Sequence, residues 1–257
     1  MQNEAISPAD AGTRLAELRA EIAALAESAR GGERLCLPFG VDAIDRRLAG
    51  GGLAADALHE AAGAAPGMAD EAAATLFTAS IAARRAAEEG TVLWAFSRRD
   101  LFAPGLALAG LSPERLLYAE CRRDEEVLAV MEEGLRHGGL AAVVGEVGRV
   151  SMTATRRLQL AAEEGGTMAL MLKRWRKAGE DPLALPSAAV TRWRLAPAPS
   201  ERLSVPGLAR PRWRLSLDRQ RGGEPFTILV EAPNETARLA LPAGAFDRAP
   251  ASRRAAA

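Results

Sequence analysis

Several residue types are scarce in this sequence, lysine above all. Lys173 and Lys177 are the two lysines among the 257 residues, so none precedes position 173. The two cysteines, Cys36 and Cys121, form no C-x-x-C pair, and the chain has two histidines. These counts argue against a Cys/His zinc site, and they make a reduced, cytoplasmic setting the expected one.

Long apolar runs are scarce as well. No segment approaches the roughly 20 apolar residues that a membrane-spanning helix needs. The first ten residues, MQNEAISPAD, contain neither the basic nor the apolar stretch of a secretory signal. We therefore expect a protein without a membrane span. The hydrophobic content of 48% is enough for one α/β domain with a packed core.

The net charge is zero, but it is unevenly distributed along the chain. Residues 1–170 carry 17 Arg against 25 Asp and Glu, a net charge of −8. Residues 171–257 carry 14 Arg and 2 Lys against 8 acidic residues, a net charge of +8. The basic C-terminal third suggests an anionic partner. The alternative is that paired surface charges cancel in the folded protein.

Hydrophobic patterns in the middle of the chain alternate between buried strands and amphipathic helices. Apolar runs predict strands at 58–62, 91–96, 116–119, 140–144 and 167–172. Helical patterns between them cover 69–89, 124–137 and 153–164, and residues 99–108 are expected to form a loop and the start of a helix. This order predicts an α/β fold with a mostly parallel, doubly wound sheet and right-handed crossovers.

The two ends of the chain follow other patterns. Short strands predicted at 189–195, 212–217 and 226–230 have no helices between them, so they should extend the sheet as an antiparallel meander. We expect one domain over 33–231, preceded by an amphipathic helix within 1–32. A Pro- and Ala-rich flexible tail should follow over 232–257.

The N-terminal helix has a narrow apolar seam. Leu15, Leu18, Ile22 and Leu25 are spaced by three, four and three residues, as in a coiled coil. The seam could dock on its own domain or on another chain. It is our candidate assembly surface.

The segment 40–63 resembles the entry to the RecA fold. RecA-like proteins have a Gly-hydrophobic-Asp stretch, a Gly-Gly-Leu turn, and a strand that leads into the phosphate-binding loop. The counterparts here are GVDAID at 40–45, GGL at 51–53 and EAAG at 60–63. More narrowly, the chain resembles the ImuA family, RecA-related accessory proteins of the bacterial DNA-damage mutagenesis cassette. That likeness covers residues 34–231, through VLW at 92–94, RDLFAPGL at 99–106, AGLSPERL at 109–116, and RWRL at 192–195 and 212–215.

The phosphate-binding loop departs from its working form. A working loop reads G-x-x-x-x-G-K-[ST], because its lysine reaches the β- and γ-phosphates and its hydroxyl holds Mg²⁺. Here Gly63 and Gly67 are one residue too close, and Met68 stands where the lysine is needed. Asp70 and Glu71 add negative charge to the helix N-terminus that should bind phosphate. We expect no nucleotide cofactor, no metal and no catalytic residues.

Two further catalytic positions of RecA-type ATPases are also altered. After the second strand the chain offers Arg98 and Arg99 where a water-polarising Glu would stand, and Asp100 is a weak substitute. The carboxylate on the Mg²⁺ side should follow the strand predicted at 140–144, where Glu146 is a weak candidate. Loss of the lysine, the hydroxyl and the Glu together argues against ATP hydrolysis.

A basic segment around a tryptophan follows the strand predicted at 167–172. It consists of Lys173, Arg174, Trp175, Arg176 and Lys177. In the RecA fold a DNA-binding loop leaves the sheet near this place. Cations that track the backbone and a ring that stacks on a base would suit single-stranded DNA. The alternative is that the ring covers the sheet. For Trp193 and Trp213 we favour the core, with the neighbouring arginines pointing outward as a basic face.

The resemblance to ImuA implies a non-catalytic accessory protein for SOS-induced translesion DNA synthesis. Its implied partners are an ImuB-type relative of Y-family polymerases, an error-prone C-family DNA polymerase, and RecA itself. Two alternatives stay open. One is a SulA-like cell-division inhibitor that binds the tubulin-like division protein, and the other is a RecA-like ATPase with a variant loop.

Overall fold

A computed structural model describes residues 35–87, 90–201, 207 and 209–242. The chain divides into two units, Met1–Arg34 and Leu35–Ala257. The predicted helix with Leu15, Leu18, Ile22 and Leu25 lies outside the described residues, and its role as an assembly surface stays a prediction. Within the described ranges, no helix is both long and apolar enough to cross a bilayer.

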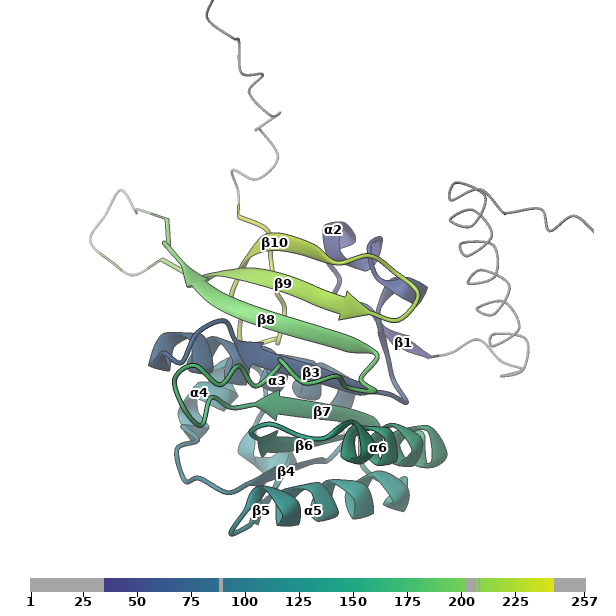
Figure 1. Cartoon of the computed structure of the whole chain (residues 1–257). Coiled ribbons are helices and arrows are strands. Elements are labelled where there is room, and N and C mark those ends of the chain that lie inside the picture. The colour runs from purple at the N-terminus through teal and green to yellow at the C-terminus, as the bar shows by residue number, and fades with distance from the viewer. Residues whose placement is uncertain (1–34, 88–89, 202–206, 208, 243–257) are drawn as a thin grey trace, which may run out of the picture. The chain divides into compact units, whose positions relative to one another are not determined.

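An eight-stranded sheet forms the centre of the domain, in the order β10-β9-β8-β3-β7-β6-β4-β5 (Figure 1). The strands are β3 (Leu58–Gly63), β4 (Val92–Phe96), β5 (Leu116–Glu120), β6 (Ala142–Val147), β7 (Met168–Lys173), β8 (Thr191–Ala198), β9 (Arg212–Gln220) and β10 (Phe226–Glu231). All neighbours from β8 to β5 are parallel, whereas β8, β9 and β10 are antiparallel to one another. The expected α/β class, with its RecA-like core and C-terminal meander, is therefore confirmed.

Helices cover both faces of the parallel part of the sheet. Long helix α3 (Met68–Ala86) and short helix α4 (Ala103–Leu108) contribute to the larger apolar cluster on one face. Helices α5 (Asp124–His137) and α6 (Met152–Gly165) enclose the cluster on the opposite face. Because both faces are covered, the inner strands are buried along their whole length: β3, β6 and β7 have no exposed residue.

A small appendage precedes the sheet. It contains the antiparallel pair β1 (Cys36–Leu37) and β2 (Leu53–Ala54), helix α2 (Asp42–Asp45) and the 3-10 turn η1 (Ala49–Gly51). A second 3-10 turn, η2 (Pro113–Arg115), lies elsewhere in the chain, directly before β5. The carboxylate of Asp45 accepts the backbone N–H groups of Phe39, Gly40 and Val41. That arrangement closes the turn at Gly40, whose φ of +73° favours glycine.

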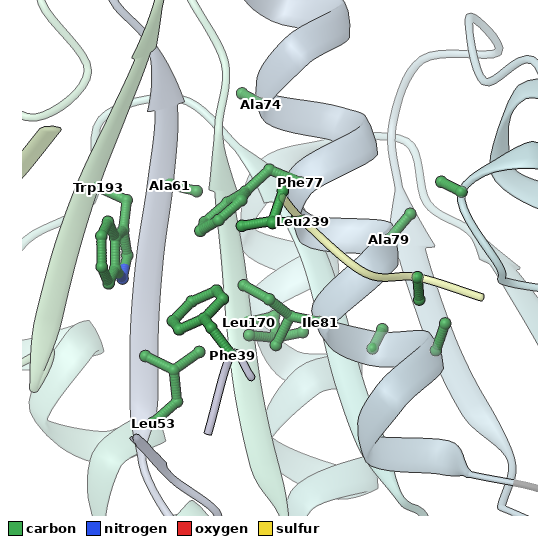
Figure 2. Packing of buried hydrophobic residues seen from close by; sticks show 14 of the residues in the cluster. Phe39, Leu53, Ala61, Ala74, Phe77, Ala79, Ile81, Leu170, Trp193 and Leu239 are labelled. Carbon is green, nitrogen blue, oxygen red and sulfur yellow. The ribbon is translucent and has the colours of Figure 1, made fainter. Parts of the chain in front are cut away.

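Aromatic rings bind the appendage to the α3 face of the sheet. Trp193 of β8 lies with its ring centroid 5.6 Å from both Phe39 and Phe77, and all three are at most 2% exposed (Figure 2). Each ring of this size removes a large apolar area from water. The prediction that Trp193 and Trp213 are core residues agrees with their exposures of 1% and 4%.

Two features of the C-terminal part differ from the sequence-based expectation, namely the pairing of β8 and the packing of residues 232–242. Strand β8 follows β7 without a helix, yet it pairs parallel with β3, so it is part of the parallel core as well as the start of the meander. Residues 232–242, expected in the flexible tail, pack on the domain. Ala237 and Leu239 are buried in the larger apolar cluster, and Glu231 forms a bridge with Ala240. The short apolar spacing in this Pro-rich stretch gave no periodic signal.

Candidate functional site

The carboxyl ends of β3, β4, β6 and β7 lie along one edge of the sheet. In open parallel sheets this edge carries the ligand crevice, at the place where successive connections turn to opposite faces. Here the connection from β3 leads to α3 on one face, and the connection from β6 leads to α6 on the other.

The loop after β3 is folded tightly against its own helix. Gly63 is the last residue of β3, and the next N–H, that of Ala64, donates to the carbonyl of Leu195 at 2.7 Å. A Cβ on Gly63 would lie 2.9 Å from the backbone of Asp70, so glycine is required there. Gly67 caps α3, and Met68 is 89% exposed. One backbone N–H of the loop, that of Ala64, is thus already bonded within the protein. The loop has no cationic side chain.

Arg174 forms ion pairs with three carboxylates near this loop, those of Glu71, Asp100 and Glu146. Its side chain is 10% exposed, and its Nη2 lies 2.8 Å from Asp100 Oδ2. Its Nε lies 3.0 Å from Glu71 Oε2 and 3.5 Å from Glu146 Oε2. The Nε–H is not aligned for a hydrogen bond, so these two contacts are ion pairs only. Nη1 donates to Thr75 Oγ1 at 3.0 Å. We call Arg174, Glu71, Asp100 and Glu146 the Arg174 network.

Glu146 is the most enclosed member of the Arg174 network. It lies inside β6 rather than after it, because the strand continues to Val147, and it is 2% exposed. The indole Nε1 of Trp94 donates to Glu146 Oε1 at 2.8 Å. Burial raises the pKa of this carboxyl, and the charge of Arg174 opposes the rise. One oxygen of Glu146 is thus engaged by the indole and the other by the guanidinium.

The segment after β7 is tied down at the same edge. The backbone N–H of Trp175 donates to Glu71 Oε1 at 2.8 Å, and its indole donates to the Gly63 carbonyl at 2.9 Å. Arg176 pairs with Asp124 at 2.6 Å. Lys177, 75% exposed, pairs with Glu180 at 3.6 Å. The ring of Trp175 therefore packs beside the loop after β3.

The sequence indicated that Lys173 follows the strand. In the structure Lys173 is instead the last residue of β7, and it is 2% exposed. Only Lys177 of the five residues 173–177 extends well into solvent, and the cations at 174, 176 and 177 each have an acidic partner. Contact of this segment with single-stranded DNA stays a prediction. In the folded chain its accessible part is Lys177, with portions of Trp175 and Arg176.

Three arginines of β8 and β9 also have acidic partners, whereas Arg214 is exposed and forms no ion pair among the described residues. Arg192 contacts Glu60 at 2.7 Å, and Arg194 contacts both Asp181 and Asp218. Arg212 contacts Glu201 and Glu231. Side chains on this face thus alternate in charge, which follows the alternative that paired surface charges cancel. The sequence gave no indication of these partners, because most of them are distant along the chain.

His59 and Arg99 are each held by contacts within the protein. His59 is buried, and its ring nitrogens contact Thr191 Oγ1 at 2.8 Å and the Ala54 carbonyl at 2.9 Å. Arg99, at the position of the missing water-polarising Glu, forms a bidentate pair with Glu120. Among the described residues, no group of three His, Cys, Asp or Glu side chains is placed to hold a metal ion.

The strand order, the helices on both faces and the glycine loop between β3 and α3 define a RecA-like α/β domain. In comparisons with curated proteins, the chain is 40% identical over 204 residues to the protein named ImuA in each of two strains of Caulobacter vibrioides. The alignment covers 76% of this chain and 83% of each relative. The chain belongs to the ImuA family. This agrees with the resemblance to that family in the sequence motifs. No family model matches it.

Proposed function

We propose that this chain is a non-catalytic accessory protein for damage-induced translesion DNA synthesis and mutagenesis. Membership of the ImuA family supports the mutagenesis cassette as its setting. The further steps, that it hydrolyses no nucleotide and acts by binding other proteins, are our own. They start from the edge of the sheet where a RecA-type ATPase would work.

The Arg174 network carries the non-catalytic part of the proposal. Hydrolysis needs a lysine on the phosphates, a hydroxyl and carboxylate for Mg²⁺, and a carboxylate for water. At the loop, Met68 and Ala69 supply neither lysine nor hydroxyl. The two remaining carboxylates, Asp100 and Glu146, are both engaged by Arg174. A guanidinium with a fixed charge therefore engages the two carboxylates that would have to serve the metal and the attacking water.

The partners proposed are those of the family: an ImuB-type relative of Y-family polymerases, an error-prone C-family polymerase, and RecA. This domain retains the RecA-like sheet although its phosphate loop is altered. We therefore propose that it acts through surfaces that bind other proteins. Binding to such proteins needs no chemistry at the sheet edge. Single-stranded DNA is a further proposed partner, through the exposed part of residues 173–177.

An assay of nucleotide turnover tests the non-catalytic claim directly. Purified full chain should release no phosphate from ATP above a protein-free blank, with or without single-stranded DNA. The matched variants are Asp100→Asn and Glu146→Gln, which change the two carboxylates that hydrolysis would use. Turnover that co-elutes with the protein and falls in either variant would establish the variant-loop ATPase instead.

A genetic experiment tests the biological role. A strain that lacks the gene should grow normally without damage and lose ultraviolet-induced mutation, while the length of damaged cells stays unchanged. Complementation with Asp100→Asn should restore mutation fully, because the carboxylate has no catalytic task. Normal induced mutation together with shorter damaged cells would support the SulA-like alternative and reject ours.

A further inference from the structure

Strand β5 is the last strand at one side of the sheet, and its outer backbone edge is open. The strand order places β5 beside β4, and among the described residues no second strand pairs with it (Figure 1). At the opposite side of the sheet, Glu231 of β10 forms a bridge with Ala240, and the segment that follows β10 packs on the domain. An open strand edge presents unpaired N–H and C=O groups that another extended strand can pair. We call this open side the β5 edge.

The pairing with β4 shows which backbone groups point into the β5 edge. The N–H of Cys121, directly after β5, donates to the Phe96 carbonyl of β4 at 2.8 Å. In a parallel pair, the N–H and C=O of one residue point to the same side, and successive residues alternate between sides. Cys121 and every second residue before it therefore point their backbone groups at β4. The residues between them, Leu116, Tyr118 and Glu120, point theirs outward.

The β5 edge has exposed apolar side chains on both faces of the sheet. Tyr118 shares the face of Leu116, which packs on the cluster under α3, and Leu117 shares the face of Ala119, which packs on the cluster under α5 and α6. Tyr118 is 46% exposed and Leu117 is 54% exposed. Edge strands are ordinarily protected by lysine, proline or a bulge. Strand β5 has no lysine or proline, its pairing with β4 has no bulge, and its one charge is that of its last residue, Glu120.

Strand β5 is complementary to itself in antiparallel orientation. When Tyr118 lies opposite Tyr118 of a second copy, Leu116 lies opposite Glu120, so every outward residue of one strand faces an outward residue of the other. Each such pair exchanges two hydrogen bonds. A shift by one residue would place outward groups opposite groups that point at β4, and a shift by two would leave one outward residue of each strand unpaired. This register therefore forms the most hydrogen bonds that two β5 strands can make.

The same register also matches the side chains. Tyr118 meets its own copy on one face of the sheet, and Leu117 meets Ala119 of the second copy on the other, which are the cross-strand contacts that stabilise sheets. No like charges lie directly opposite each other. Beyond the strand, Glu114 of each copy is placed toward the strand end that carries Arg122 of the other. The charges at the two ends of β5 are thus complementary as well.

We propose that two copies of this chain associate through the β5 edge, antiparallel and about a twofold axis between the two Tyr118 residues, so that their sheets join into one. A second copy fits this edge because its outward backbone groups, its apolar side chains and the charges at its ends all match the same strand in reverse. Such an isologous contact closes at two subunits. One short strand buries little surface, so the dimer is weak, with a dissociation constant in the micromolar range. The proposal does not rest on the function proposed above, because it needs only the geometry of the β5 edge.

Charge exchange at position 118 tests both the contact and its register. Tyr118→Lys and Tyr118→Glu each place like charges opposite each other in the dimer. At low ionic strength, full-length chains of either variant should therefore sediment as monomers at concentrations where the wild type dimerises. An equimolar mixture of the two should dimerise again, because opposite charges then face each other. The matched control is Leu229→Lys on the other edge strand, where Leu229 is 40% exposed, and it should dimerise as the wild type does.

Several results of this experiment would overturn the proposal. A wild-type chain that stays monomeric up to high micromolar concentration would do so, as would a dimer that both charges leave intact. A dimer that is lost on deletion of residues 1–30 but not in either variant would assign self-association to the N-terminal seam. A monomeric wild type whose binding to a partner protein is lost in Tyr118→Lys would assign the β5 edge to a strand of that partner instead of a second copy.

Cross-linking gives a second measurement that does not depend on a charge at the edge. In a chain with both native cysteines replaced by alanine, Tyr118→Cys places two thiols on paired residues whose Cα atoms lie about 5.5 Å apart, within the range of a disulfide. Oxidised glutathione should convert this variant to a covalent dimer. The control is Glu120→Cys, which is also exposed and on the same face but lies about 13 Å along the strands from its copy, so it should stay monomeric. No cross-link in Tyr118→Cys, or equal cross-linking of both variants, would contradict the proposed register.

Discussion

Removal of Arg174 should destabilise the domain strongly. Arg174→Met keeps most of the apolar stem but leaves Glu146, which is 2% exposed, without its cation. Breaking a buried ion pair on one side costs roughly 3–5 kcal/mol, because the remaining charge stays buried. Glu71 and Asp100 are 18% and 40% exposed, so water compensates part of their loss. We expect a decrease in Tm of roughly 6–20 °C, at about 2–4 °C per kcal/mol for a domain of this size.

The loss should depend on pH in a defined direction. The pKa of Glu146 is already raised by burial, and Arg174 holds it down. Without Arg174 this pKa rises further, and a carboxyl whose folded-state pKa exceeds its unfolded value costs stability as the pH rises through that range. The deficit of Arg174→Met should therefore be full at neutral pH and shrink on acidification, because Glu146 then takes up a proton.

Two further variants make the test decisive. Adding Glu146→Gln to Arg174→Met removes the stranded charge but keeps an acceptor for Trp94, so it should recover part of the loss and abolish its pH dependence. The control is Arg99→Met, which breaks the exposed pair with Glu120 and should leave Tm unchanged. If Arg174→Met were as stable as the wild type, or if its deficit were equal at all pH values, our account of the Arg174 network would be refuted.

Three further outcomes are expected. Deletion of residues 1–30 should leave a folded core by circular dichroism but weaken self-association or partner binding in sedimentation, and unchanged behaviour in both would reject the assembly surface. Neutralising Arg176 and Lys177, the two cations of 173–177 that reach solvent, should lower the salt slope of single-stranded DNA binding by about 0.7 per lost phosphate contact, and equal binding by the variant would reject that interface. In Gly165→Ala the new Cβ would meet the Leu135 carbonyl, so unfolding in urea should show a loss of roughly 1–3 kcal/mol. Wild-type stability of this variant would mean that α5 and α6 can separate freely.

Local patterns were sufficient for most of the fold. The buried strands were visible because a sheet covered on both faces has mostly apolar residues along its inner strands, with Glu146 in β6 and Lys173 in β7 as exceptions. The pairing of β8 with β3 was not visible, since it joins residues about 130 positions apart and follows a connection without a helix. Periodicity gives the type of an element, whereas it contains no information on which distant strand becomes its neighbour.

The candidate site was predicted only in outline. The altered loop at Gly63, Gly67 and Met68 was apparent, because the required lysine and hydroxyl are absent from the sequence itself. The sequence indicates that the basic stretch from Lys173 to Lys177 follows the strand as one segment, but β7 includes Lys173, and distant acidic partners give Arg174 and Arg176 different environments. Ion pairs between loops are set by tertiary packing, so composition cannot reveal them.

The position of β3 in the sheet also affects how the chain is made. Both neighbours of β3, namely β7 and β8, begin more than 100 residues later in the sequence. During synthesis at about 5–20 residues per second, β3 must therefore wait roughly 5–20 s for its first partner to leave the ribosome. Throughout that interval a strand that is fully buried in the folded protein has two unpaired edges, the state in which nascent chains aggregate. Chaperone demand in this protein should thus be concentrated before residue 168 is made, and it should end when β8 completes the pairing.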